Sequence, residues 1–192
     1  MSKKTVIILA IIIFVVGNIT GFFLGVFTVK GAQSFLISLF ENEKAADVKG
    51  QNEIARSDFN LKYPSNWKID TADEDYDPDC LFSIDSPGSS HVMFIVYDTA
   101  TDPEENIKNQ IKAHSEKLIK NPGLVYFNRW GQYDGTGVEL KGRVLGVLKG
   151  AVRIFSYSNQ ARSFVVVEFS YDEDLKLVGP GFKLIESTFC LK

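Results

Sequence analysis

Hydrophobic positions follow three different patterns along this 192-residue chain. Residues 5–29 are an unbroken apolar run without a charged side chain, and residues 41–56 are mostly polar. From residue 57 onward, short aromatic and β-branched runs alternate with turn residues. At about 1.5 Å rise per residue, a helix over the first run is long enough to cross a hydrocarbon core of about 30 Å. The pattern predicts a transmembrane helix at 5–29 that precedes a folded domain.

Positive charge around the apolar run predicts its orientation. Lys3 and Lys4 precede the run, whereas only Lys30 follows it directly. By the positive-inside rule, residues 1–4 form a cytoplasmic stub and the rest of the chain lies outside the cell membrane. A cleaved signal peptide is the alternative, although its apolar region usually spans only about 7–15 residues. Residues 30–56 are then predicted to be a juxtamembrane segment and a linker.

The remaining residues, 57–192, predict a single extracytoplasmic domain. Runs typical of strands, bounded by turn residues, lie at 59–63, 67–69, 81–84, 91–97, 125–133, 137–148, 151–157 and 164–171. Asp102-Pro103-Glu104-Glu105 predicts a helix start, since Asp caps, Pro suits the first position and acids complement the helix dipole. Apolar residues at 182, 184, 185 and 189 predict a terminal helix. This order indicates an α+β domain with an antiparallel sheet covered by helices.

Three phrases of this domain resemble the PsbP-like family, named after an extrinsic subunit of photosystem II. They are Phe59-x-Leu61-x-Tyr63-Pro64-x-x-Trp67, Gly135-x-Gly137 and Phe182-x-x-Ile185-x-x-Thr188-Phe189. The resemblance implies an α/β/α sandwich and a membrane-anchored prokaryotic member of the family. It also implies a binding or scaffold role, because the family has no shared catalytic constellation. Independently of the resemblance, such aromatic side chains are expected to be anchors of the core.

Charge and motifs narrow the function further. The chain carries 21 basic and 24 acidic residues, without a cluster of Lys and Arg in the domain, which argues against nucleic acid as the partner. It contains no G-x-S-x-G, GxxxxGK[ST] or GxGxxG motif, and its two histidines, His91 and His114, lack ligand spacing. We therefore expect a non-catalytic module without a cofactor that binds another envelope protein. A small hydrophobic ligand between sheet and helix is the lesser alternative.

An acidic segment at residues 70–79 is the best local candidate for chemistry. Asp75, Asp77 and Asp79 match positions 1, 3 and 5 of a calcium-binding loop. The match ends there, because Cys80 replaces the turn glycine and Ser86 replaces the bidentate glutamate. Two interpretations stay open: a solvated acidic loop, or a weak calcium site that makes the protein a calcium-dependent adhesion or assembly factor.

Three glycines in the predicted membrane helix, Gly17, Gly21 and Gly25, share one helical face. Without side chains there, two helices can approach closely, so the spacing predicts self-association or pairing with another membrane span. The alternative is that glycine is simply common in such helices.

Cys80 and Cys190 are the only cysteines of the chain. An even number of cysteines in an oxidising compartment is compatible with a disulfide. It is equally compatible with two unbridged thiols, so both alternatives stay open.

Overall fold

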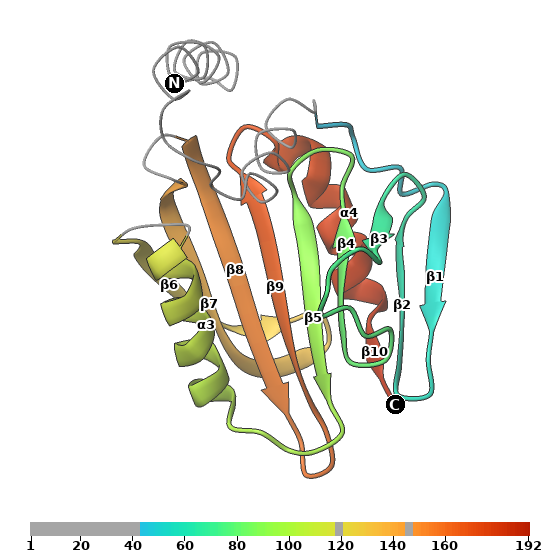
Figure 1. Cartoon of the computed structure of the whole chain (residues 1–192), viewed down its shortest axis with the longest axis vertical. Helices are drawn as coiled ribbons and strands as arrows, with labels where there is room; N and C mark the ends of the chain where they lie inside the picture. The colour runs from blue at the N-terminus through green and yellow to red at the C-terminus, as the bar shows by residue number, and fades with distance from the viewer. Residues whose placement is uncertain (1–42, 118–120, 145–147) are drawn as a thin grey trace, which may run out of the picture.

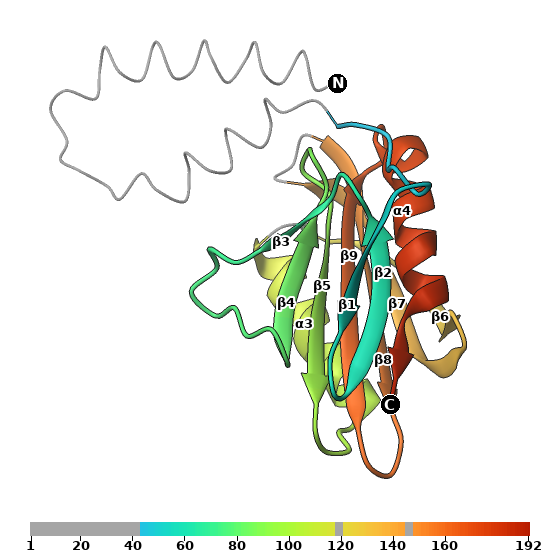
Figure 2. The same cartoon turned by 90° about the vertical axis from the view of Figure 1, so that its right-hand side faces the viewer.

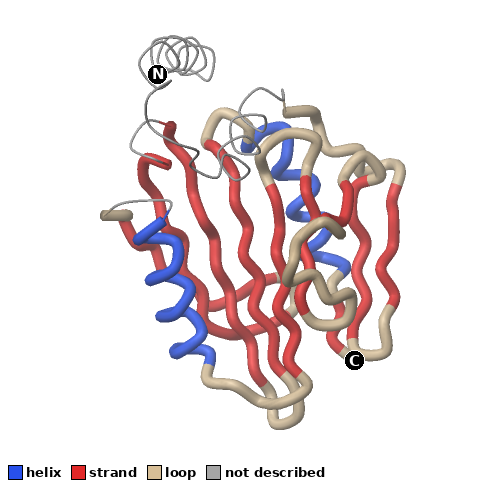
Figure 3. Tube along the Cα trace, viewed as in Figure 1, coloured by secondary structure: helices blue, strands red, loops and turns tan. Residues whose placement is uncertain are grey.

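The computed structural model describes residues 43–117, 121–144 and 148–192, and Figure 3 shows the distribution of helices and strands. The strands are β1 (Gln51–Ala55), β2 (Phe59–Pro64), β3 (Lys68–Asp70), β4 (Leu81–Asp85), β5 (His91–Tyr97), β6 (Gly123–Trp130), β7 (Tyr133–Val144), β8 (Leu148–Ser158), β9 (Ser163–Tyr171) and β10 (Cys190–Leu191). The helices are α3 (Pro103–Lys117) and α4 (Leu175–Thr188).

In the described part of the chain, two antiparallel sheets and two helices build three layers. The large sheet has the strand order β3-β4-β5-β9-β8-β7-β6, and a small sheet has the order β1-β2-β10. Helix α3 packs against β7 and β8, whereas α4 packs against β9 and β2 (Figures 1 and 2). The α+β class and the antiparallel sheet with helices over it are therefore confirmed.

Strand β9 lies in the middle of the large sheet and is buried along its whole length. Successive side chains of a strand point to opposite faces. Phe164 and Val166 accordingly join the core on the α4 side, while Val165 and Val167 join the core on the α3 side. Burial on both faces explains why this segment is apolar at almost every position.

Aromatic rings fill the core on the α4 side. Phe189 lies 5.2 Å from Phe94 and 4.7 Å from Phe164 between ring centroids, and Trp67 meets Phe182 edge-on at 5.4 Å. Each such pair adds about 0.5–1.5 kcal/mol beyond the area it buries. The aromatic and aliphatic residues in the first and last phrases of the family resemblance are thus core residues.

The linker predicted for residues 30–56 is folded into the domain wherever the structure describes it. Strand β1 pairs with β2 along its length, and Ile54 is buried. Upstream of β1, a carboxylate oxygen of Glu43 accepts a hydrogen bond from Ser86 Oγ at 2.8 Å. The linker prediction was wrong at this end because backbone pairing needs no hydrophobic pattern.

Helix α4 begins at Leu175, well before its predicted start at residue 182. Gly and Pro disfavour helix interiors, so the sequence Gly179-Pro180-Gly181 concealed the first turns. Gly181 has a packing role instead, because a Cβ atom there would lie 2.6 Å from Cζ2 of Trp67. The absence of a side chain at this position lets the helix lie directly on the indole.

A second difference concerns the hairpin between β7 and β8. The strand runs predicted at 137–148 and 151–157 place the connection at Lys149-Gly150, but both residues belong to β8, where Gly150 pairs with Gly142. A Cβ atom on Gly150 would lie 2.9 Å from the carbonyl oxygen of Ser170 on β9. This glycine therefore marks a close approach of two strands.

The predicted stub at 1–4, the predicted membrane helix at 5–29 and the glycines Gly17, Gly21 and Gly25 all lie outside the described residues. Within the described part of the chain, neither helix is both long and apolar enough to span a bilayer. Membrane anchoring, orientation and helix pairing stay predictions.

Candidate functional site

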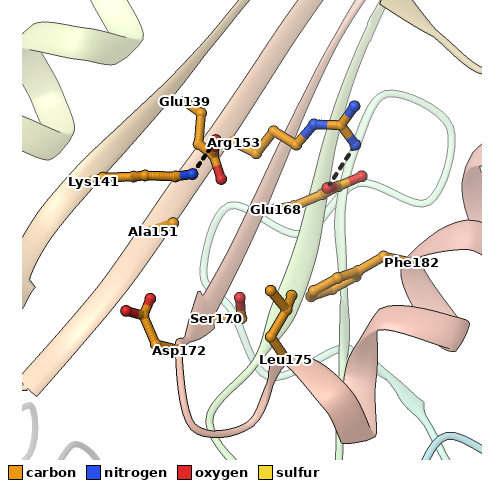
Figure 4. A pocket seen from close by; sticks show the side chains of 9 residues that line it. All are labelled: Glu139, Lys141, Ala151, Arg153, Glu168, Ser170, Asp172, Leu175 and Phe182. Atoms are coloured by element: carbon orange, nitrogen blue, oxygen red, sulfur yellow. Dashed lines mark hydrogen bonds and ion pairs between the residues drawn. The ribbon is translucent and has the colours of Figure 1, made fainter. Parts of the chain in front are cut away.

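Beside α4, the large sheet carries a hollow of about 280 Å³, shown in Figure 4. Its floor comes from β7, β8 and β9, and its wall comes from α4 and the residues that lead into it. The lining side chains are Glu139, Lys141, Ala151, Arg153, Glu168, Ser170, Asp172, Leu175 and Phe182. We call this hollow the groove.

Strand register sets the charges of the groove in a row across the sheet. Glu139 is opposite Arg153, and Arg153 is opposite Glu168, so the signs alternate. Nη1 of Arg153 lies 3.4 Å from Oε2 of Glu168 and 3.5 Å from Oε2 of Glu186 on α4. The guanidinium also lies 4.5 Å from the centroid of the Phe127 ring, a cation–π arrangement. One cation is therefore shared between two carboxylates.

Glu168 is the buried end of this row, with 6% of its surface exposed. Its Oε1 accepts a hydrogen bond from Nε1 of Trp130 at 2.9 Å. Burial raises the pKa of Glu168, while the charge of Arg153 and the Trp130 hydrogen bond act in the opposite direction. Both oxygens of this carboxylate are engaged, which fixes its orientation in the floor.

The turn between β6 and β7 holds α4 over the sheet. Gly131 has φ = +56° and donates its backbone N–H to Oε1 of Glu186 at 2.9 Å. A side chain at Gly131 would collide with the carbonyl oxygen of Glu186. Gln132 donates from Nε2 to the carbonyl of Phe189 at 3.2 Å. These contacts fix the position of the groove wall relative to its floor.

The outer part of the groove is less fully bonded. Nζ of Lys141 lies 3.0 Å from Oε2 of Glu139, forming a partly exposed ion pair. The hydroxyl of Ser170 and the carboxylate of Asp172 also line the groove. Within the described residues, neither of these two groups has a hydrogen-bond or ion-pair partner. They remain available to a ligand.

The wall of the groove is apolar where α4 begins. Leu175 is 52% exposed, and Phe182 reaches the groove from the next turns of the helix (Figure 4). None of the described lining residues is a histidine or a cysteine. The groove thus combines bonded charges, two available oxygen-bearing groups and an apolar wall, which suits binding.

Strand β6 lies next to the groove at the end of the large sheet and, within the described part, pairs with β7 alone. Leu124, Val125 and Tyr126 are 42%, 51% and 66% exposed. Val125 is opposite Glu139, so it extends the row of the groove to the sheet edge. The sequence predicted a strand here but not its exposure, because the exposure depends on the strand order.

The acidic segment is distributed over successive turns. Oδ1 of Asp77 accepts the backbone N–H of Asp79 at 2.9 Å, and Oδ1 of Asp73 accepts that of Asp75 at 3.1 Å. Oδ1 of Asp79 lies 3.5 Å from Nε of Arg56. Among the described residues, no three acidic, histidine or cysteine side chains are grouped so that they could hold a metal ion. Asp75, Asp77 and Asp79 are not brought together, and calcium binding stays a prediction.

Both cysteines are free thiols in this structure, Cys80 exposed and Cys190 partly buried in β10. Desolvation by surrounding atoms and then the neighbouring carboxylate of Asp77 raise the pKa of the Cys80 thiol. A raised pKa keeps the sulfur protonated and weakly nucleophilic. Of the two alternatives for this pair, the structure shows the unbridged one.

A broader hollow of about 710 Å³ lies beside β3 and the end of β4. Two acidic side chains, Asp70 and Asp85, are among its lining residues. Burial and then the charge of Asp70 raise the pKa of Asp85 to about 6. This carboxyl group therefore stays protonated to a higher pH than an ordinary aspartic acid.

No protein-family model matches the chain, and no curated protein matches it. No family is assigned. Among solved structures, the chain is similar to a protein from Bacteroides thetaiotaomicron VPI-5482, with 13% identity over 76% of this chain and 49% of that one and a TM-score of 0.49. The chain thus spans about half the length of that protein.

Two further structures are similar at lower scores. LpqN, described as involved in cell envelope biogenesis of Mycobacterium tuberculosis, has 12% identity over 74% of this chain and 91% of its own, with a TM-score of 0.44. Cyanobacterial PsbP from Synechocystis sp. PCC 6803 has 10% identity over 76% and 94%, with a TM-score of 0.42. At these values, the likenesses transfer no activity or partner to this chain.

Proposed function

We propose that this chain is a membrane-tethered extracytoplasmic module that binds another envelope protein and performs no catalysis itself. The exposed apolar strand β6 at the end of the large sheet carries the proposal. Its outer backbone groups can pair with an extended segment of a partner, whose side chains would contact Leu124, Val125 and Tyr126. The tether rests on the uncharged run at residues 5–29.

Irregularity within β6 limits where a partner strand can pair. The register between β6 and β7 shifts between Phe127 and Arg129, which marks a β-bulge. A bulge bends and twists the strand, so regular pairing along the outer edge ends there. We therefore propose that the partner segment pairs with residues 123–127 of this chain. Charged residues on β7, Glu139 and Lys141, lie close enough to contribute to its specificity.

The neighbouring groove also favours a binding role over a catalytic one. Its most deeply buried acid, Glu168, is fixed by Trp130 and Arg153 and does not point freely at a substrate position. General acid–base work needs a group within hydrogen-bond reach of a reacting proton. A carboxylate with both oxygens engaged is better suited to maintain the shape of a binding surface.

A site-specific photo-crosslinking amino acid tests the proposal in full-length protein in its native membrane. Placed at Tyr126, it is expected to give one discrete adduct that contains an envelope protein. The matched control position is Leu177 on α4, which is 37% exposed and apolar but lies away from β6. Val125→Asp should abolish the adduct at 126 without changing the melting temperature. Equal adducts at both positions, or none at 126, would refute the proposal.

A further inference from the structure

The charges around the groove do not balance. Acidic groups outnumber basic ones by four to two among the described side chains that line the groove or are paired to its lining: Glu139, Glu168, Asp172 and Glu186 against Lys141 and Arg153. Arg153 is shared between two carboxylates, and Lys141 is paired with Glu139. The groove therefore has a negative excess that a cationic ligand would compensate.

The excess is concentrated where a ligand can reach it. Asp172 is exposed at the groove mouth, and its carboxylate has no ion-pair or hydrogen-bond partner within the described residues. Its backbone N–H is used, because it donates to the carbonyl of Lys149 at 3.1 Å. The neighbouring hydroxyl of Ser170 adds an acceptor deeper in the groove. Together they provide a polar site for a hydrogen-bond donor.

The apolar wall adds a second requirement. Leu175 is half exposed beside Asp172, and Phe182 and Ala151 line the same hollow. Covering half-exposed apolar surface is favourable by about 25 cal/mol per Å². A ligand that suits this wall carries a short apolar stem next to its charged end.

We propose that the groove binds an organic cation, an ammonium or guanidinium group on a short aliphatic stem. The cationic end lies against Asp172 and the Ser170 hydroxyl, and the stem lies along Leu175 and Phe182. A bare metal ion does not match this arrangement, since no three potential ligands are grouped within the described residues. An ammonium or guanidinium group carries several hydrogen-bond donors and no acceptor, which suits a carboxylate with a hydroxyl nearby.

Two sources supply this chemistry: a free alkylamine, or a lysine or arginine side chain presented by a protein. The inference does not depend on strand pairing at β6, because none of its contacts comes from that strand. A negative crosslinking result at β6 would therefore not contradict cation binding in the groove. Likewise, absence of cation binding would not contradict strand pairing at β6.

Calorimetric titration of the full-length protein in detergent tests the inference, with cadaverine as the probe and 1,5-pentanediol as its uncharged control of equal length. Cadaverine is expected to bind saturably, and the diol is expected not to bind. Asp172→Asn should weaken cadaverine binding about tenfold, the ratio that corresponds to about 1.4 kcal/mol. The matched control is Glu173→Gln, which removes the neighbouring exposed carboxylate that does not line the groove.

The outcomes separate the possibilities. Equal binding of diol and cadaverine, or equal affinity of wild type and Asp172→Asn, would overturn the inference. Equal melting temperatures of both variants would show that the fold is retained. A second titration uses a short peptide with one lysine against the same peptide with norleucine. Binding of the lysine peptide alone, more tightly than cadaverine, would assign the site to a protein side chain, and the reverse order would assign it to a free amine.

Discussion

Two alanine substitutions in α4 are expected to have clearly different effects although they lie two residues apart. An added Cβ at Gly181 would lie 2.6 Å from Cζ2 of Trp67, 3.0 Å from Cβ of Ala46 and 3.0 Å from Cγ of Pro64. An added Cβ at Gly179 would meet no atom within 4 Å outside its chain neighbours. The same chemical change therefore tests packing at one position and backbone preference at the other.

The magnitudes follow from opposing contributions. Overpacking costs about 1–3 kcal/mol, and three rigid neighbours place Gly181→Ala in the upper part of that range. The better helix propensity of alanine offsets about 0.5–1 kcal/mol. We expect a net loss of about 1–2 kcal/mol, or about 3–6 °C in melting temperature. At Gly179 the propensity gain is opposed by the ring of Pro180, which disfavours a helical residue before it. That variant should stay within about 0.5 kcal/mol of wild type.

Urea unfolding followed by far-ultraviolet circular dichroism measures both free energies on the full-length protein. A double variant, Gly181→Ala with Trp67→Phe, separates the cause, because residues in contact couple by about 0.5–3 kcal/mol. Its loss should be smaller than the sum of the two single losses. If Gly181→Ala proves as stable as Gly179→Ala, or if the double variant is additive, the close approach of α4 to Trp67 is refuted.

Three further predictions concern ionisable groups. Since the pKa of Asp85 is about 6 when folded, against an ordinary 3.8, its stabilising contribution is complete below pH 3.8 and is lost as the pH rises through 6. Because Asp85 is partly exposed, we expect Asp85→Asn to raise the free energy of unfolding by about 1–2 kcal/mol at pH 8 and to leave it unchanged at pH 4, as measured by urea unfolding. Arg153→Met should lower the free energy of unfolding by about 2–4 kcal/mol in the same urea experiment, because Glu168 stays buried without its cation. Adding Glu168→Gln to this variant should recover part of the lost free energy. At pH 8, the thiol of Cys80 should react with a maleimide more slowly than a model cysteine peptide, because its pKa is raised.

The sequence predicted most elements because their patterns are local. Strand β5 alternates between the two cores, and the segment of β9 is apolar on both faces, so each is visible as a strand without knowledge of its neighbours. The sequence Asp102-Pro103-Glu104 predicted the start of α3, and the structure confirms it, since Asp102 accepts the N–H of Glu104 at 2.9 Å. This capping contact is made within three residues and is therefore visible in the local sequence.

The groove could not be predicted because it depends on strand register. Glu139, Arg153 and Glu168 lie far apart in the sequence and meet only through two pairings, β7 with β8 and β8 with β9. A shift of one residue in either pairing would turn one of these side chains to the α3 face. The sequence located the strands to within a few residues, and that accuracy is too low to show which side chains share a face.

The position of the groove follows from which strands of the large sheet the aromatic core and helix α4 cover. Helix α4 and the small sheet cover the α4-side face over β5 and β9, where the rings of Phe94, Phe164 and Phe189 pack together. The motifs that resemble the PsbP-like family supply many of these core residues, so they specify the architecture and leave the surface unspecified. Beyond α4, the same face continues over β8 and β7 to the exposed edge of β6, with charges instead of rings. Specificity in this protein therefore has to come from residues outside the recognisable motifs. The groove lies in the uncovered part of this face, and the β6 surface lies at the sheet edge, where Val125 continues the same face and Tyr126 points to the opposite one.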